Sequence, residues 1–123
     1  MSDVGYLKPE MDGGDEVLIG QIRTLELAVD LSLRPTGEGP RSRRPSHLIF
    51  AKSAQGRLTQ IGSAWTKEMN GADRMGETFL SLTLDDPSFA RPLNVAAFKD
   101  AETGDYTITW RRRQAGNGAA PNA

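Results

Sequence analysis

The clearest pattern in the chain is a strict alternation of apolar and polar or small residues from Leu25 to Leu33. Its apolar members are Leu25, Leu27, Val29, Leu31 and Leu33, and they are separated by Glu26, Ala28, Asp30 and Ser32. A period of two places alternate side chains on opposite faces of a β-strand, whereas a helix repeats its apolar positions every three or four residues. The run therefore predicts a strand with one face in a hydrophobic core. A second β-like run precedes it at 17–22, where Gly20 indicates a bulge or bend.

Similar runs separated by turn signals continue along the chain. We predict strands at about 47–53, 57–67, 77–84, 93–99 and 106–111, with turn residues at 55–56, 70–71, 86–87 and 100–105 between them. Strict alternation places Trp65 on the face of Ile61 and Trp110 on the face of Ile108, so either tryptophan could belong to the core. About six or seven short strands predict an all-β domain, a small antiparallel barrel or sandwich, with an OB-like barrel as one form.

The flanks differ from this body in composition. Residues 1–16 contain Pro9, Gly13 and Gly14 together with several acidic side chains, which predicts a flexible acidic arm. Residues 114–123 are small or polar and predict a disordered tail. We therefore expect one all-β domain at 17–113, interrupted at 34–46 by a basic loop too rich in proline and glycine for a strand or helix.

The composition limits what such a domain can do. The 123 residues are 37% hydrophobic and 25% charged, which is typical of one globular domain and too little for two cores. Cysteine is absent, which excludes disulfides and thiolate zinc sites and suits a reducing cytoplasm. Neither a secretory signal nor an apolar stretch of roughly 20 residues is present. We expect a cytoplasmic protein without a membrane association.

Four stretches of these strands resemble a known family. They are TLELAVDL (24–31), IGSAWTK (61–67), LSLTLDDPSF (80–89) and GDYTITW (104–110), and LSLTLDDPSF is the most specific of them. The chain resembles the family catalogued as domain of unknown function 736 from about Gly20 to Arg112. The resemblance implies a small bacterial protein, often encoded on plasmids and integrative elements. It implies a fold type and a mobile-element setting, and no mechanism.

The residues offer little for catalysis. The only histidine, His47, adjoins the basic loop and lies in no nucleophile-elbow motif, so a Ser-His-Asp triad is not expected. Asp85 and Asp86 are neighbours on an extended chain and point to opposite faces, and Asp86 before Pro87 is typical of a turn. Phosphate-binding glycine loops and calcium loops are also missing from the sequence. We expect a protein that is not an enzyme and that uses neither a cofactor nor a metal.

Charge is segregated along the chain although the formal total is −1. Residues 1–33 hold two basic and seven acidic side chains, and 34–67 hold seven basic and one acidic. Residues 68–110 hold three basic and eight acidic side chains, and three arginines follow at 111–113. If the basic segments converge in the fold, they form one cationic surface beside a tryptophan. The candidate site residues are Arg41, Arg43, Arg44, Arg57, Lys67, Arg111, Arg112, Arg113, Trp65 and Trp110.

Two functions use such a surface. The first is an accessory binding protein of a bacterial mobile element that interacts with and modulates a host or plasmid protein, with the 25–33 strand as a sheet edge for pairing. The alternative is a module for single-stranded nucleic acid, in which arginines contact phosphates and an exposed tryptophan stacks on bases. We expect a protein partner first and nucleic acid second, with the chain a monomer or an edge-strand dimer.

Overall fold

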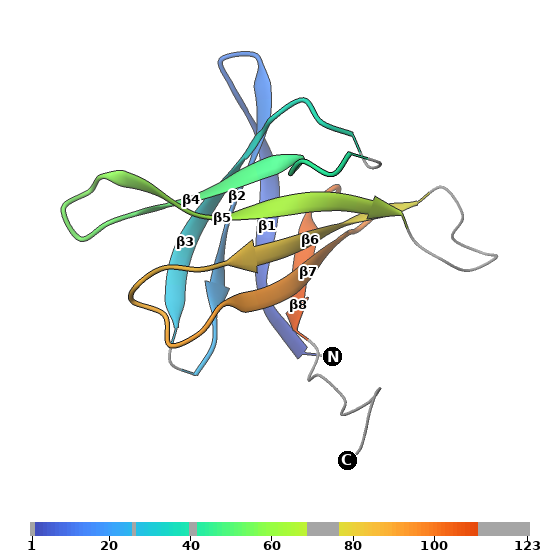
Figure 1. Cartoon of the computed structure of the whole chain (residues 1–123). Coiled ribbons are helices and arrows are strands. Elements are labelled where there is room, and N and C mark those ends of the chain that lie inside the picture. The colour runs from blue at the N-terminus through green and yellow to red at the C-terminus, as the bar shows by residue number, and fades with distance from the viewer. Residues whose placement is uncertain (1, 26, 40–41, 69–76, 111–123) are drawn as a thin grey trace.

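Eight antiparallel strands form a closed barrel in the order in which they occur along the chain (Figure 1). A computed structural model describes residues 2–25, 27–39, 42–68 and 77–110. Within these residues there is no helix, and hence no helix long and apolar enough to cross a membrane. The strands are β1 (Ser2–Asp12), β2 (Asp15–Arg23), β3 (Ala28–Pro35), β4 (His47–Lys52), β5 (Leu58–Glu68), β6 (Thr78–Leu84), β7 (Leu93–Lys99) and β8 (Tyr106–Trp110).

The simple strand order divides the connections between two ends of the barrel. Each strand pairs with the next one along the chain, and β1 also pairs with β8 to close the barrel. We name the end that carries the β1–β2, β3–β4, β5–β6 and β7–β8 connections the loop end. The terminal end carries the start of β1, the end of β8 and the β2–β3, β4–β5 and β6–β7 connections (Figure 1). Two connections that are far apart in the sequence therefore lie at the same end of the barrel only if an even number of strands separates them.

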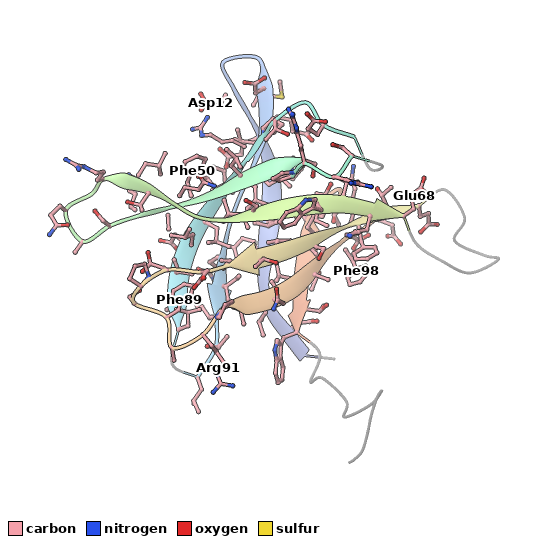
Figure 2. The ribbon with its side chains drawn as sticks, in the orientation of Figure 1. Asp12, Phe50, Glu68, Phe89, Arg91 and Phe98 are labelled. Carbon is pink, nitrogen blue, oxygen red and sulfur yellow. The ribbon has the colours of Figure 1, made fainter. Side chains whose placement is uncertain are left out.

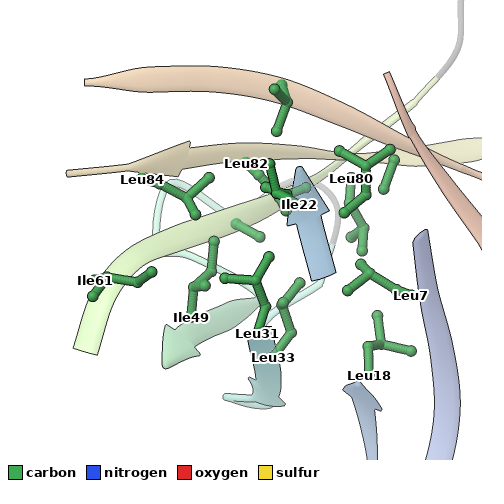
Figure 3. Packing of buried hydrophobic residues seen from close by; sticks show 14 of the residues in the cluster. Leu7, Leu18, Ile22, Leu31, Leu33, Ile49, Ile61, Leu80, Leu82 and Leu84 are labelled. Carbon is green, nitrogen blue, oxygen red and sulfur yellow. The ribbon is translucent and has the colours of Figure 1, made fainter. Parts of the chain in front are cut away.

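The core fills the barrel with the inward-facing positions of the strands (Figure 3). The fully buried side chains include Leu7, Ile22, Leu33, Ile49, Leu82, Leu84 and Ile108, so seven different positions on six strands close the interior. Burying each such side chain contributes about 1.5–3 kcal/mol relative to leaving it in water. The alternation that predicted strands is thus the alternation between this core and the outer surface, and the all-β antiparallel fold is confirmed.

The strand number and the amino-terminal arm were predicted wrongly. The barrel has eight strands, because residues 2–12 form β1, which pairs with both β2 and β8. Gly13 and Gly14 have φ values of 62° and 92°, as a two-residue hairpin turn requires, so they connect strands rather than end them. Pro9 is tolerated because its nitrogen lies on the β8 side of β1, where the pairing with β8 has already ended at Leu7. The acidic composition of residues 1–16 therefore led us to miss a strand of the barrel.

Gly20 serves close packing and not the bulge that we predicted. The pairing of β2 runs through Gly20 without a shift toward both β1 and β3. A Cβ atom at Gly20 would overlap the carbonyl oxygen of Tyr6 on β1, so only glycine fits there. Register shifts lie elsewhere: between Ile49 and Phe50 of β4, where β5 contributes an extra residue, and between Asp3 and Gly5 of β1 in its pairing with β8.

The strand at 25–33 is not the edge that was predicted. It forms β3, which starts at Ala28 and pairs with β2 over residues 28–33 and with β4 over residues 32–35. A closed barrel leaves no strand with a completely free side. The pairing of β3 with β4 is nevertheless partial, since among the described strands none opposes 28–31 on that side. We name this space the β3–β4 seam; it opens toward the terminal end.

Candidate binding surfaces at the two ends of the barrel

The basic loop at the loop end is held in place by bonds within itself. Thr36 Oγ1 donates to the carbonyl oxygen of Pro45 at 2.6 Å, and the backbone nitrogen of Thr36 donates to Ser46 at 2.9 Å. Ser42 Oγ donates to Glu38 Oε1 at 2.8 Å and accepts from the Arg44 nitrogen at 3.0 Å. The described part of the loop is therefore shaped by its own short polar side chains, with the Arg44 side chain exposed.

Trp65 lies on the outer surface beneath this loop and is not part of the core. The bulge between β4 and β5 places the side chains of both Ile61 and Ala64 in the barrel core, although they are three residues apart. Trp65, which follows Ala64, therefore faces outward. Strict alternation was the wrong assumption beyond Ile61. The indole Nε1 donates to the carbonyl oxygen of Arg43 at 3.1 Å, and the ring is half-buried. Trp65 thus fastens the basic loop to β5, and its only polar atom is already used.

Acidic side chains share the loop end with the basic loop. Arg34 Nη2 lies 3.1 Å from Asp12 Oδ2 of the β1–β2 hairpin, with both side chains about half exposed. The other carboxylates on or beside the connections of this end are Asp15, Glu16, Glu38, Glu68, Glu77, Asp100, Glu102 and Asp105. Because successive strands run in opposite directions, the acidic turns and the basic loop lie at the same end of the barrel. The segregation along the sequence is therefore not retained in space.

The predicted cationic surface is not assembled from the described residues. Arg43 and Arg44 lie at the loop end, and Lys67 lies at the same end, next to the last residue of β5. Arg57 lies in the β4–β5 turn and Trp110 ends β8, both at the terminal end. Arg41, Arg111, Arg112 and Arg113 lie outside the described residues. The two tryptophans thus belong to opposite ends of the barrel, and only Trp65 accompanies the basic loop.

A buried polar cluster at the loop end has a structural role. Ser46 is 3% exposed, and its Oγ lies 3.0 Å from His47 Nδ1, accepts from Thr66 Oγ1 at 2.9 Å and donates to the Ala64 carbonyl at 3.3 Å. Adjacent serine and histidine side chains could suggest a nucleophile and its base. Here the hydroxyl is enclosed and fully engaged in joining the loop to β5. The pair therefore holds the barrel together at this end.

Glu16 influences two titratable groups at the loop end. Burial lowers the pKa of His47, and the Glu16 carboxylate partly opposes this effect. Burial also raises the pKa of the Tyr106 hydroxyl, and the same carboxylate raises it further. His47 is therefore neutral at pH 7, and the carboxylate lies close enough to both rings to act on each.

The terminal end carries apolar hollows as well as charged residues such as Arg57, Asp86 and Arg91. The largest has a volume of about 880 Å³ and is lined by Val4, Leu25, Leu93, Val95, Trp110 and the charged Arg91, among others. A second, of about 420 Å³, lies in the β3–β4 seam between Val29, Ala51, Ile61 and Phe89. A third, of about 340 Å³, lies between Phe89 and Arg91 and shares residues with each (Figure 2). We name the three hollows together the terminal groove.

Two features of the terminal groove were not predicted. Leu25 has a relative exposure of 102%, although alternation assigned it to the core side of a strand. The strand begins only at Ala28, so Leu25 lies in the β2–β3 connection and projects into solvent at the rim of the groove. Phe89, from the LSLTLDDPSF stretch, packs against the core and separates the hollows. The hydrophobicity of both residues was visible in the sequence, but their exposure depends on the barrel.

The β6–β7 connection presents Phe89 through a rigid turn. The Asp86 Oδ2 atom accepts from the Ser88 nitrogen at 2.9 Å and from Ser88 Oγ at 2.5 Å. The Phe89 nitrogen donates to the Asp86 carbonyl at 2.8 Å. These bonds to Ser88 lower the pKa of Asp86. The prediction that Asp86 serves turn chemistry is confirmed.

Aromatic rings on the outer surface of the barrel are already paired. The ring of Phe98 on β7, which is labelled in Figure 2, stacks on the ring of Phe79 on β6 with centroids 5.3 Å apart and an interplanar angle of 21°. Lys8 Nζ lies 5.9 Å from the centroid of the Tyr6 ring. Alternation within β1, β6 and β7 could have located these outward positions. Cross-strand pairs of this type stabilise a sheet, and a base would have to displace the existing contact to stack.

Comparison with known proteins gives a family whose function is unknown. No curated protein and no solved structure matches the chain. The described residues also contain no group of three or more histidine, aspartate or glutamate side chains placed to hold a metal ion. Residues 4–113 match the family described as protein of unknown function (DUF736), a span that includes all of the barrel after Asp3. The chain belongs to the DUF736 family.

Proposed function

We propose that this chain is a non-enzymatic binding protein that recognises a protein partner at the terminal end of its barrel. The observation that carries the proposal is the full exposure of Leu25 beside a hollow of about 880 Å³ that is lined by Leu93, Val95 and Trp110. An exposed leucine at the rim of a concave apolar surface is typical of an interaction site. Tryptophan and arginine, here Trp110 and Arg91, are the side chains most enriched among residues that dominate binding energy.

The loop end is a poorer candidate for the same role. Its basic loop is engaged in bonds to itself and to Trp65 Nε1, and its surroundings are acidic. A nucleic-acid backbone approaching Arg43 and Arg44 would meet the carboxylates of the neighbouring turns, which repel phosphate. The terminal end presents apolar surface that a partner can cover, and the free energy of covering such surface drives association.

Binding of single-stranded nucleic acid is the second candidate function. Arg91 and Trp110 line the same hollow, which is the combination that contacts a phosphate and a base in modules for single strands. The hollow is lined mainly by apolar side chains, and that lining favours a protein. The proposed setting remains the one implied by the family resemblance: a protein of a bacterial mobile element that modulates a host or plasmid protein in the cytoplasm.

Capture from a bacterial lysate with matched variants tests the proposal. Leu25→Asp places a charge at the groove, and Met11→Asp places the same charge on the β1–β2 hairpin, where Met11 is also exposed. The wild type and Met11→Asp should retain one dominant protein after nuclease treatment, and Leu25→Asp should lose it. Oligothymidylate that binds the wild type and is weakened by Arg91→Ala, without a retained protein, would instead support the nucleic-acid candidate.

A further inference from the structure

We infer that the β3–β4 seam receives an extended segment of the partner, which adds to the barrel as an extra strand. This inference rests on the proposed function and specifies how the partner binds. It concerns residues 28–31 of β3, which have β2 on one side and none of the described strands on the other. Strand addition to such a side provides backbone hydrogen bonds together with pockets for alternate side chains.

The hydrogen-bond alternation of an antiparallel pair identifies the backbone groups that face the seam. The Thr24 nitrogen donates to the Leu27 carbonyl, so the residues at every second position after Leu27 turn their backbone groups toward β2. Ala28 and Asp30 therefore turn theirs toward β4. At the other end of β3, the Thr36 nitrogen donates to the Ser46 carbonyl, so the even-numbered residues face β4 there as well. Both residues pair with β2 only across non-hydrogen-bonded positions.

The opposite wall of the seam shows a matching arrangement. The Ser53 nitrogen donates to the Arg57 carbonyl, so Ser53 and Ala51 turn their backbone groups toward β5. Lys52 turns its groups toward β3, yet β3 residues oppose β4 only up to the Ser32 and Phe50 pair. Backbone donors and acceptors thus face the seam from both walls. An inserted strand would satisfy them as a neighbouring barrel strand does elsewhere.

The seam also fits the side chains of a strand. Its hollow of about 420 Å³ lies on the core side, between Val29, Ile61 and Phe89, and has room for a branched aliphatic side chain. On the outer side the exposed Asp30 and Lys52 flank the position of the inserted strand with opposite charges. The occupant is therefore an extended partner segment that alternates an apolar residue facing inward with polar residues facing outward, as a barrel strand of this protein does.

The chain itself does not supply this occupant. The residues after Trp110 contain no valine, isoleucine, leucine, methionine or aromatic residue, so they lack the inward anchor. The other long segment outside the described residues, 69–76, lies in the sequence between β5 and β6, and the ends of these strands at Glu68 and Thr78 belong to the loop end. A segment from another protein is the occupant that remains compatible with the composition of the chain.

Proline substitution separates a backbone role from a side-chain role. Asp30→Pro removes the amide that faces the seam and leaves the β2 pairing intact, in the way that Pro9 is accommodated on the unpaired side of β1. Asp30→Ala is the matched control, because it removes the carboxylate and keeps the amide. Peptides of twelve residues selected from a random displayed library on the wild type should bind Asp30→Pro at least tenfold more weakly than they bind Asp30→Ala, because only the proline removes the amide.

Hydrogen exchange of the wild-type protein keeps the test independent of any variant's folding. The Ala28 and Asp30 amides should exchange rapidly in the free protein and become protected when a selected peptide binds. Unchanged exchange at both amides with a bound peptide would overturn the inference, even if Leu25→Asp abolishes that binding and supports the proposed function. Protection in the free protein that depends on its concentration would also overturn it, because a second copy would then occupy the seam.

Discussion

The two ends of the barrel are built from the same strands but expose different surfaces to solvent. At the loop end, polar side chains bond to one another: Ser42 to Glu38, Arg34 to Asp12, and Trp65 to the backbone of Arg43. At the terminal end, Leu25 projects freely and Trp110 lines an apolar hollow beside Arg91. The difference teaches that charge counted along a sequence is a poor guide to a binding surface, because the most basic segment lies at the end of the barrel whose other connections carry many carboxylates.

The largest effect should come from removing what both ends share. Leu33 is fully buried in the barrel core, and Leu33→Ala should lower the free energy of unfolding by about 2–5 kcal/mol through lost burial and a cavity. Both ends should then unfold together in one transition, measured by urea denaturation. Leu25→Ala is the control from the same residue type, and it should change stability by no more than about 0.5 kcal/mol. Two separate transitions would show that the ends are independent.

A smaller effect should distinguish the loop end alone. Trp65→Phe keeps an aromatic ring but removes the hydrogen bond to the Arg43 carbonyl, which should cost about 1 kcal/mol. The basic loop should then be cut faster by trypsin after Arg43, whereas the bond after Arg44 resists trypsin because Pro45 follows it. Peptide binding at the terminal groove should be unaffected. Unchanged cleavage would mean that Trp65 does not restrain the loop.

The pH dependence of stability should also belong to the loop end. Burial holds the pKa of His47 below its ordinary value of about 6.5, so the unfolded chain takes up this proton more readily than the barrel does. Stability should therefore fall as the pH drops from about 7 through 6.5 toward the folded pKa. His47→Gln should flatten this part of the profile, measured by urea midpoints. Asp86, whose pKa is also lowered, loses its contribution only as the pH falls below about 4.

Replacing Glu16 should move two titrations in the same direction. Its carboxylate raises the pKa of both His47 and Tyr106, so Glu16→Gln should lower both values. NMR titration of the two rings measures this directly. Asp105→Asn, a change of the same kind on the β7–β8 connection, is the control. A shift at one ring only would show that the carboxylate does not lie between them.

The smallest effect is expected from the ion pair at the rim of the loop end. Arg34 and Asp12 are both about half exposed, and such pairs contribute between zero and about 1 kcal/mol. A double-mutant cycle of Arg34→Ala and Asp12→Ala should give a coupling within this range that decreases at 1 M salt. A coupling that persists at high salt would indicate that the basic loop is held by more than its own short side chains.

The sequence predicted the parts of the fold that depend on local alternation. Leu31 and Leu33 are buried as their period indicated, and the Asp86 turn forms as its residue types required. Errors arose where partners distant in the chain decide the outcome. Gly13 and Gly14 led us to predict a flexible arm, but the residues before them form β1, which is held in the barrel by its pairing with the distant strand β8. One additional residue in β5 turned Trp65 outward, and no local pattern announces such a shift.

The surfaces were harder to predict than the strands. Whether Arg43 and Trp110 meet depends on the parity of the strands that separate them, and an error of one in the strand count reverses the answer. The β3–β4 seam was even less accessible, since it arises where two paired strands diverge. The exposed Leu25 was predicted to face the core because the alternating pattern begins three residues before β3 starts at Ala28.

The pairing of Ser2 with Trp110 has a practical consequence for anyone who handles this protein. Because β1 starts and β8 ends beside the terminal groove, a fusion tag or a surface linker at either position would stand over the hollow that we assign to the partner. A circular permutant that joins these positions and opens at the Gly13–Gly14 turn would place its new ends at the opposite side. Immobilised in that form, the barrel would present its groove outward.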